Sequence, residues 1–239
     1  MIEQARYLPR AGYTPMPWRN GAGVTQEIAR EPAHGETFTW RLSLATIGAS
    51  GPFSSYPGYE RVVALVDGRG IRLTIKDAPT QVLAARGEHA VFDGGATTDC
   101  ELLDGACTDL SLMVREPGRI NAVTRYRIGR ELAMPAACET LQALFVLHGA
   151  IECRVRGPAA PGRAPAAHPH TLSFNDTLLI HGRGDLWSLA QVSNDTAELL
   201  VIAFAAASGE TIVAGPSAAR AGAAQPAGIR CRTPCSSSM

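Results

Sequence analysis

The chain has 239 residues, of which 22 are basic and 22 acidic, so its formal net charge is zero. A neutral chain gives no indication of binding to nucleic acid or to an anionic membrane, and no apolar run reaches the roughly 18–20 residues of a membrane-spanning helix. The first residues lack the basic and then apolar order of a signal peptide, so we expect a cytoplasmic protein. Its six cysteines show no C-x-x-C pair and no zinc-like spacing with histidine.

Short segments rich in β-branched residues, separated by glycine, proline and aspartate, predict β-strands along the first half of the chain. A proline-marked extended segment at 7–17 leads into a glycine turn, and Asp67-Gly68 between two apolar runs predicts a β-hairpin. Many short strands at near-regular spacing, with little helical periodicity, indicate a β-sandwich or barrel. The predicted strands are 24–29, 38–45, 61–66, 71–75, 81–84, 90–92, 98–102 and 109–114.

The predicted strand 38–45 alternates clearly between apolar and polar residues, and alternate residues of a strand point to opposite faces. In the wall of a small barrel, the apolar face can pack outward against a second layer while the other face lines the interior. Arg41 and Ser43 then point into a pocket, where Thr25 and Glu27 can join them. The apolar face of this strand consists of Phe38, Trp40, Leu42 and Leu44.

After a bridge predicted at 119–128, a second β-rich set begins. The stretch 144–151 repeats the strand, glycine turn and strand of 64–71, so we predict two similar β-barrels in one chain. The strands predicted in the second set are 140–147, 151–155, 171–174, 177–180, 187–192 and 198–204. The predicted units are a first barrel at 1–120, a second, degenerate barrel at 121–207 and a mostly disordered tail at 208–239, rich in Ala, Gly, Ser and Pro.

The stretch 51–70 resembles the first motif of the cupin barrel, which runs from glycine to glycine through two histidines and a glutamate. Here the histidine positions hold Pro57 and Tyr59, and the glutamate position holds Val63. None of these residues supplies the imidazole or carboxylate that a transition metal binds. The pair His168-Pro-His170 lies in a predicted loop, where its geometry does not favour a metal site. We therefore predict a cupin-type barrel that holds neither a metal nor another cofactor.

Four motifs, in the right order, resemble those of the HutD/Ves family. They are P-W-R-N-G-A-G-V-T-Q-E-I at 17–28, W-R-L-S at 40–43, G-P-F-S-S-Y-P-G-Y-E-R at 51–61 and D-L-S-L-M-V-R at 109–115. The resemblance covers residues 14–115 well and is mostly one of layout beyond 120. It implies an all-β chain of two cupin-type barrels (double-stranded β-helix or jelly roll, RmlC-like) with few short helices. Three positions depart from the family's usual residues, namely Ala22, Glu60 and Ser111.

The resemblance also implies a role in bacterial histidine utilisation, in which HutD-type proteins tune the pathway rather than catalyse a step. The implied ligand is a small carboxylated or formylated metabolite, of the formylglutamate or urocanate type. On this basis we expect a non-enzymatic, ligand-binding regulator that forms a homodimer. One alternative is a metal-independent cupin enzyme, an isomerase or hydrolase, with Glu27 as the general base. Another, left open by the Ves branch, is a stress-induced folding module without a ligand.

Arg41 and Arg61 are the strongest candidates for binding such a ligand, because the planar fork of a guanidinium matches a carboxylate bidentately. The alternative for Arg41 is a structural ion pair with Glu27. Trp18 either contacts the ligand or plugs the barrel, and Tyr56 either rims the pocket or only packs. The predicted ligand-binding residues are Trp18, Asn20, Thr25, Glu27, Arg41, Ser43, Tyr56 and Arg61.

Overall fold

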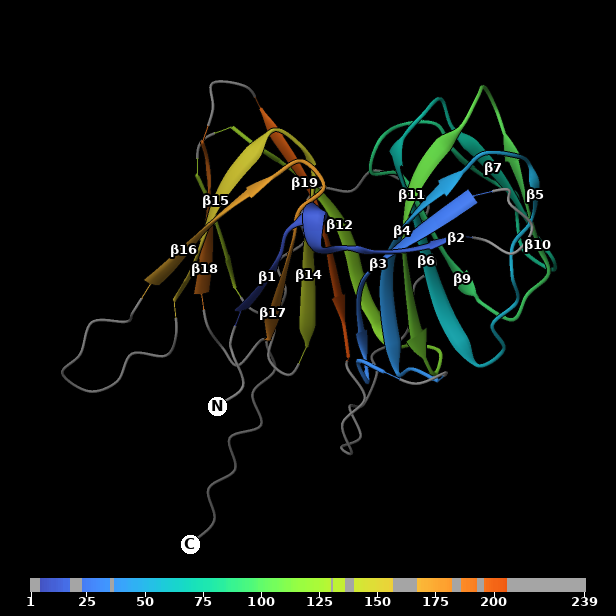
Figure 1. Cartoon of the computed structure of the whole chain (residues 1–239), viewed down its shortest axis with the longest axis horizontal. Coiled ribbons are helices and arrows are strands. Elements are labelled where there is room, and N and C mark those ends of the chain that lie inside the picture. The colour runs from blue at the N-terminus through green and yellow to red at the C-terminus, as the bar shows by residue number, and fades with distance from the viewer. Residues whose placement is uncertain are drawn as a thin grey trace, which may run out of the picture.

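The structure is a computed structural model that describes residues 5–17, 23–34, 37–129, 131–135, 140–156, 167–181, 186–192 and 196–205. Within these residues the chain forms antiparallel strands, and a 3-10 turn, η1 (Arg10–Gly12), is the one helical element. Figure 1 shows two groups of strands side by side, with η1 near their junction. The almost all-β composition agrees with the fold class predicted from the sequence.

The first half of the molecule consists of two facing sheets. Sheet I has the strand order β2-β3-β4-β11-β6-β9, and sheet II has the order β5-β10-β7-β8. The strands of sheet I are β2 (Thr14–Pro17), β3 (Gly23–Glu31), β4 (Trp40–Ile47), β11 (Cys107–Arg115), β6 (Tyr59–Asp67) and β9 (His89–Asp93). Those of sheet II are β5 (Gly51–Pro52), β10 (Thr98–Leu102), β7 (Ile71–Ile75) and β8 (Gln81–Leu83).

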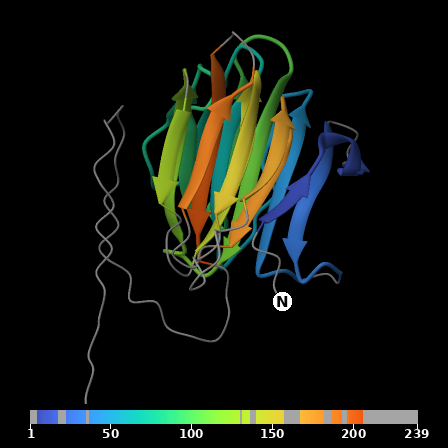
Figure 2. The same ribbon diagram turned by 90° about the vertical axis from the view of Figure 1, so that its left-hand side faces the viewer.

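The second half is also a pair of sheets. Sheet III has the order β1-β17-β14-β19-β12, and sheet IV has the order β13-β18-β15-β16. The strands of sheet III are β1 (Ala5–Leu8), β17 (Thr177–His181), β14 (Leu141–His148), β19 (Ala197–Phe204) and β12 (Ile120–Ile128). Those of sheet IV are β13 (Glu131–Pro135), β18 (Leu186–Gln191), β15 (Ala150–Arg156) and β16 (Ala167–Ser173). Figure 2 views the molecule from this half, whose yellow and orange strands lie in front.

The two halves repeat one strand order. In sheet I the run β4-β11-β6-β9 corresponds to β12-β19-β14-β17 in sheet III, and the four strands of sheet II correspond in order to those of sheet IV. The repeat extends to a turn: Leu65 exchanges backbone hydrogen bonds with residues 87–88, and Val146 does so with residues 175–176. Within the described residues no pairing joins the two sheets of either half, so each half is a sandwich of two open sheets.

Three apolar clusters fill the spaces between the sheets. The central cluster joins the outer faces of sheets I and III, where Trp40 meets Phe204 edge to face at 5.5 Å. The second lies between sheets III and IV and includes Ile151 and Leu178. The third lies between sheets I and II and includes Val63 and Leu73. Sheet I is therefore apolar on its outer face, as the alternation of 38–45 predicted, and its inner face is free to carry polar groups.

The turn at Asp67-Gly68 does not form the predicted hairpin. Strand β6 pairs with β11 and β9, whereas β7 pairs with β10 and β8, so the chain crosses here from sheet I to sheet II. Gly68 and Gly70 have φ values of +106° and +120°, which glycine adopts far more readily than other residues. Gly149, with φ of +72°, makes the corresponding crossing from β14 to β15. A corner between sheets and a hairpin share the same local sequence signal.

Other segments also differ from the sequence-based expectation. His168 and His170, predicted to lie in a loop, belong to strand β16, which pairs with β15. The predicted bridge at 119–128 is strand β12, which pairs along its length with β19. Strand β1, at the start of the chain, pairs with β17 and therefore lies in sheet III, among strands of the second half. The predicted domain division at residue 120 stays a prediction, and the predicted tail at 208–239 lies outside the described residues. No helix in the described part of the chain is long and apolar enough to cross a membrane.

Candidate functional site

The inner face of sheet I, turned toward sheet II, gathers most of the predicted site residues. Side chains directly opposite one another on neighbouring strands point to the same face. Arg41 and Arg61 both lie opposite Met113. Two residues further along, and so on the same face, Ser43 lies opposite both Ser111 and Glu27. Thr25 follows opposite Ala45 on the same face. Tyr56 lies in the loop before β6, and the predicted residues Trp18 and Asn20 lie outside the described residues.

Arg61 is the most buried cation of this face, with 9% of its surface exposed. Its Nε donates a hydrogen bond to Ser111 Oγ over 3.3 Å, and its guanidinium lies over the Phe53 ring at 4.4 Å. Burial lowers the pKa of Arg61 from its ordinary value; the Asp109 carboxylate opposes this shift, and the Arg41 guanidinium adds to it. A buried cation in this position is stabilised by an anion nearby.

Arg41 is half-buried two strands away. Its Nη2 lies 3.4 Å from Tyr56 Oη, and its guanidinium lies over the rings of Phe38 at 5.0 Å and Tyr56 at 5.5 Å. Its Nε is buried without a hydrogen-bond partner among the described residues. Within the same residues, no carboxylate lies within 4.0 Å of either the Arg41 or the Arg61 guanidinium. The guanidinium groups of these two arginines therefore contact aromatic rings and hydroxyl groups, and neither forms an ion pair with a carboxylate of the described residues.

The predicted alternative for Arg41, an ion pair with Glu27, is absent. Glu27 instead approaches Arg30, with Oε2 and Nη1 3.9 Å apart, and Oε2 itself is buried without a hydrogen bond in the described part of the chain. A β-bulge between Glu27 and Ala29 makes this approach possible, because the extra residue brings Arg30 onto the inner face opposite Arg41. The bulge also places Ala29 in the central apolar cluster, whereas the regular alternation of the predicted strand 24–29 would put Ala29 on the same face as Thr25 and Glu27.

Asp109 and Ser111 are members of the site that the predicted residue set left out. Asp109 is 1% exposed, and its Oδ2 has no hydrogen-bond partner among the described residues. Burial raises the pKa of Asp109 to about 6, although the nearby Arg61 lowers it. The signal that could have found both residues is the alternation of 109–114, where Asp109, Ser111 and Met113 share a face against Leu110, Leu112 and Val114.

Aromatic rings surround the two arginines, and Tyr56 is the one among them that belongs to the predicted set of ligand-binding residues. Phe38 precedes β4 and packs with Tyr59 at 4.7 Å between ring centres, so its side chain lies with the site and not on the apolar face predicted for it. Phe53 and Phe92 lie over Arg61, and Tyr59 Oη donates to the Phe38 carbonyl over 2.7 Å. Stacked rings hold a guanidinium in place while leaving its in-plane donors open.

The residues at the cupin metal positions do not fit a metal. Val63 is fully buried in the apolar cluster between sheets I and II, and Tyr59 uses its hydroxyl to bond the Phe38 carbonyl. Pro57, at the third position, has no donor atom on its side chain. Among the described residues no group of three His, Cys, Asp or Glu side chains gathers as a metal site would require.

The fold and this face define the class of protein: a cupin-like, almost all-β chain with a polar, arginine-bearing interior in its first half. A HutD sequence profile matches residues 10–201, and the chain belongs to the HutD family. It is 34% identical over 189 residues to an uncharacterised 21.2 kDa protein in the hutC 3' region of Pseudomonas putida, covering 79% of this chain and 93% of the relative.

Solved structures of similar sequence have the same fold. A conserved protein of unknown function from Pseudomonas aeruginosa PAO1 aligns with a TM-score of 0.73 at 31% identity, covering 85% of this chain and 100% of the other. HutD from Pseudomonas fluorescens SBW25, determined in a formate condition, aligns with a TM-score of 0.63 at 28% identity, covering 84% and 98%. Oxalate decarboxylase of Lactobacillus farciminis, at 8% identity and a TM-score of 0.61, shares the fold alone.

Proposed function

We propose that this protein is a non-enzymatic regulator of histidine utilisation that binds a small carboxylated or formylated metabolite in the first half of the molecule. Membership of the HutD family links the chain to histidine utilisation. The observation that carries the ligand is the pair Arg41 and Arg61, both directed to the inner face of sheet I without a carboxylate within 4.0 Å in the described residues. Buried charges are ordinarily paired, so an anionic ligand is the partner that this pair lacks.

The surroundings of the two arginines set the chemistry of the ligand. Ser43 and Ser111, each 2% exposed, add hydroxyls beside the guanidiniums, and Phe53 and Phe92 add apolar walls. These groups are complementary to a small carboxylic acid whose remaining part is short and either apolar or conjugated. Formylglutamate and urocanate are both acids of this kind. Charge-assisted, bidentate pairs of this kind are about twice as strong as neutral hydrogen bonds. The side chains at the cupin metal positions do not fit a metal, so the proposed binding relies on protein donors.

The interior of the second half differs in a way that supports placing the ligand in the first. Among the described residues of this half, the buried charged side chains are the acids Asp176 and Glu198, and no cation is buried. Glu198, the buried acid of β19, is instead paired with Arg125 and Arg127. The second sandwich, which repeats the first in strand order, is on this view a structural support for the first. The predicted homodimer remains a prediction, which light scattering would test.

Calorimetric titration with formylglutamate, urocanate, glutamate and formate tests the proposal. We expect one of these carboxylates to bind, and Arg61→Gln to raise its Kd at least about tenfold, since a hydrogen bond to a charged group contributes ~1.5–3 kcal/mol. Arg69→Gln is the matched control, because Arg69 is 80% exposed and lies at the corner between β6 and β7, outside the site. Equal affinities of wild type and Arg61→Gln, with both proteins folded by circular dichroism, would place the ligand elsewhere.

A metal-independent enzyme is the second candidate, and Glu27 is the observation that favours it. Its Oε2 is buried without a hydrogen bond among the described residues, on the same face as the two arginines. A carboxylate so placed can take a proton from a ligand within hydrogen-bond reach. NMR spectra of each bound metabolite, recorded over a day with catalytic amounts of protein, separate the two functions. Product that forms with wild type and not with Glu27→Gln would establish the enzyme and overturn the regulator.

A further inference from the structure

A cavity of about 180 Å³ lies on the outer face of sheet I, where the two halves of the molecule meet. Its walls come from β3, β4, β6 and β11, from η1, and from the turn between β16 and β17. None of the described residues of the proposed carboxylate site lines it. Cavities of roughly 150 Å³ hold a molecule the size of benzene, so this one has room for a small ring and a substituent.

The walls contributed by the second half are fixed by hydrogen bonds to one carboxylate. Asp176 accepts bonds from Tyr7 Oη, from the backbone nitrogen of Arg10 and from the backbone nitrogen of Ser173, each over 2.9 Å. Tyr13 Oη adds a bond to the carbonyl of Asn175 over 2.6 Å. The segment that links β1 to β2 is thus tied to the turn beside it. A site whose walls are already held costs a ligand little ordering on binding.

The polar groups of the cavity include one cation and one orphaned acceptor. Arg10 lines the cavity, and within the described residues its guanidinium makes no ion pair or hydrogen bond. Asn175 also lines it and is 5% exposed, yet its Oδ1 is buried without a donor among the described residues. A buried amide oxygen without a donor costs free energy comparable to a lost hydrogen bond, so Asn175 favours a ligand that brings an N–H or O–H.

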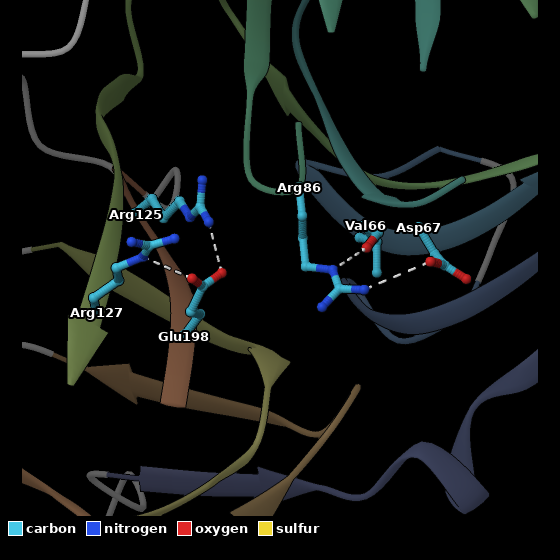
Figure 3. Close-up of polar contacts among 6 residues, drawn as sticks. All are labelled: Val66, Asp67, Arg86, Arg125, Arg127 and Glu198. Atoms are coloured by element: carbon cyan, nitrogen blue, oxygen red, sulfur yellow. Dashed lines mark hydrogen bonds and ion pairs between the residues drawn. The ribbon is translucent and has the colours of Figure 1, made fainter. Parts of the chain in front are cut away.

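The other charged residue that lines the cavity, Asp67, already has an ion-pair partner. Asp67 lies 3.6 Å from Arg86, and the Nε of Arg86 also donates to the carbonyl of Val66 over 3.0 Å; Figure 3 shows both contacts. The guanidinium of Arg86 lies 6.0 Å from the ring centre of Phe174, which is 39% exposed and lines the cavity. An apolar wall, a free cation and an orphaned acceptor are therefore present together.

We propose that this junction cavity is a second binding site, which takes a small organic carboxylate with an apolar ring and one hydrogen-bond donor. Arg10 binds the carboxylate, Phe174 contacts the ring, and Asn175 Oδ1 accepts the donor. The site is separate from the proposed carboxylate site, because it lies on the opposite face of sheet I. A molecule bound here bridges the β1–β2 connection, sheet I and the β16–β17 turn, so it also holds the two halves together.

The test uses 4-hydroxybenzoate as the probe and calorimetric titration of the full chain. We expect binding to wild type, at least about tenfold weaker binding to Arg10→Gln, and little binding of benzamide, which has the ring without the charge. Asn175→Gly removes the acceptor and keeps a residue suited to the positive φ of 68° at this position. This variant should bind 4-hydroxybenzoate no better than it binds benzoate. Arg6→Gln, an exposed neighbour on β1, is the control and should bind as wild type does.

Arg61→Gln distinguishes the two sites. If the probe occupies the junction cavity, this variant binds 4-hydroxybenzoate like wild type, whatever it does to the metabolites above. Loss of probe binding in Arg61→Gln with full binding in Arg10→Gln would overturn the junction site while supporting the proposed carboxylate site. Absence of binding to wild type at millimolar probe, or equal binding to wild type and folded Arg10→Gln, would also overturn it.

Discussion

Arg41 and Arg61 lie on either side of Met113, opposite the same residue of β11. Neighbouring strands are ~4.8 Å apart, so the backbones of the two arginines are separated by roughly twice that distance. Their side chains leave one face of one sheet, and each guanidinium is stacked on aromatic rings. Two like charges brought this close repel each other, which the Arg41 effect on the pKa of Arg61 reflects. We expect an anion bound between them, as proposed above, to relieve this repulsion.

Replacing Ser111 by alanine should weaken both the fold and the ligand site. Ser111 Oγ accepts the hydrogen bond from Arg61 Nε, and removing one partner of a buried charged bond costs ~1–3 kcal/mol. We expect a lower unfolding free energy in urea and a several-fold higher Kd for the bound metabolite. Ser43→Ala removes a hydroxyl of the same 2% exposure from the opposite strand. Equal losses in the two variants would show that the bond to Arg61 has no special effect.

Asp109 should make the protein more stable as the pH falls through 6. Its folded pKa of about 6 lies above the ordinary 3.8, because burial disfavours the charged form, so the folded protein binds this proton more tightly than the unfolded chain does. The cost of the ionised carboxylate is fully present above pH 6 and is lost between pH 6 and pH 4. The difference in pKa corresponds to ~3 kcal/mol.

Asp109→Asn removes this titration and provides the measurement. Urea unfolding of wild type and variant is measured at pH 7.5, 6 and 4.5. The difference in unfolding free energy between the two should favour the variant most at pH 7.5 and should shrink as the pH falls. Asp104→Asn, whose side chain is 77% exposed, should show no such trend. A stability difference between Asp109→Asn and wild type that is constant over this range would contradict the raised pKa.

Alanine at Gly68 should destabilise the protein severely. A Cβ there would lie 2.5 Å from Cys107 Sγ and 2.8 Å from Cys107 Cα, and the φ of +106° disfavours any side chain. Gly105→Ala is the control, because Gly105 has a φ of +73° and open space around its Cβ position. We expect the control to lose ~1–2 kcal/mol and Gly68→Ala to lose clearly more, measured as a fall in Tm. Similar losses would mean that Cys107 and its neighbours move aside.

Glu198→Gln should loosen sheet III near the junction of the halves. The Glu198 carboxylate accepts hydrogen bonds from Arg125 Nη2 at 2.7 Å and Arg127 Nε at 2.8 Å, as Figure 3 shows. Burial alone would raise the pKa of Glu198, but these bonds lower it overall. Its contribution to stability is therefore present above the unfolded pKa and is lost as the pH falls through the lower folded pKa.

We expect Glu198→Gln to reduce the unfolding free energy at pH 7 by ~1–2 kcal/mol. Glu101→Gln is the control, because Glu101 is 57% exposed in its pair with Arg72, and exposed pairs contribute ~0–1 kcal/mol. Chemical unfolding of both variants measures the difference. A loss of unfolding free energy from Glu101→Gln as large as that from Glu198→Gln would show that burying the Glu198 carboxylate does not strengthen its bonds to the two arginines.

Much of the site could be predicted because strand alternation is local. The pattern of 38–45 placed Arg41 and Ser43 opposite Leu42 and Leu44, and the packing of sheets I and III confirms that division of faces. Asp109 and Ser111 were harder to find, since they are more than 45 residues from Arg61 in sequence and reach it through the pairing of β11 with β6. The Glu27 bulge also has no local signal, because it depends on the fit of β3 to β4.

The sequence by itself determined the all-β class, the family, and which residues of each strand share a face, because these depend on short-range pattern and motif. Only the tertiary structure decided that Asp67-Gly68 is a corner between sheets, that β1 joins sheet III, and that Arg41 and Arg61 flank one residue. The physical reason is that hydrogen-bond pairing between distant strands is set by packing of the whole sandwich, and identical local sequences allow more than one pairing.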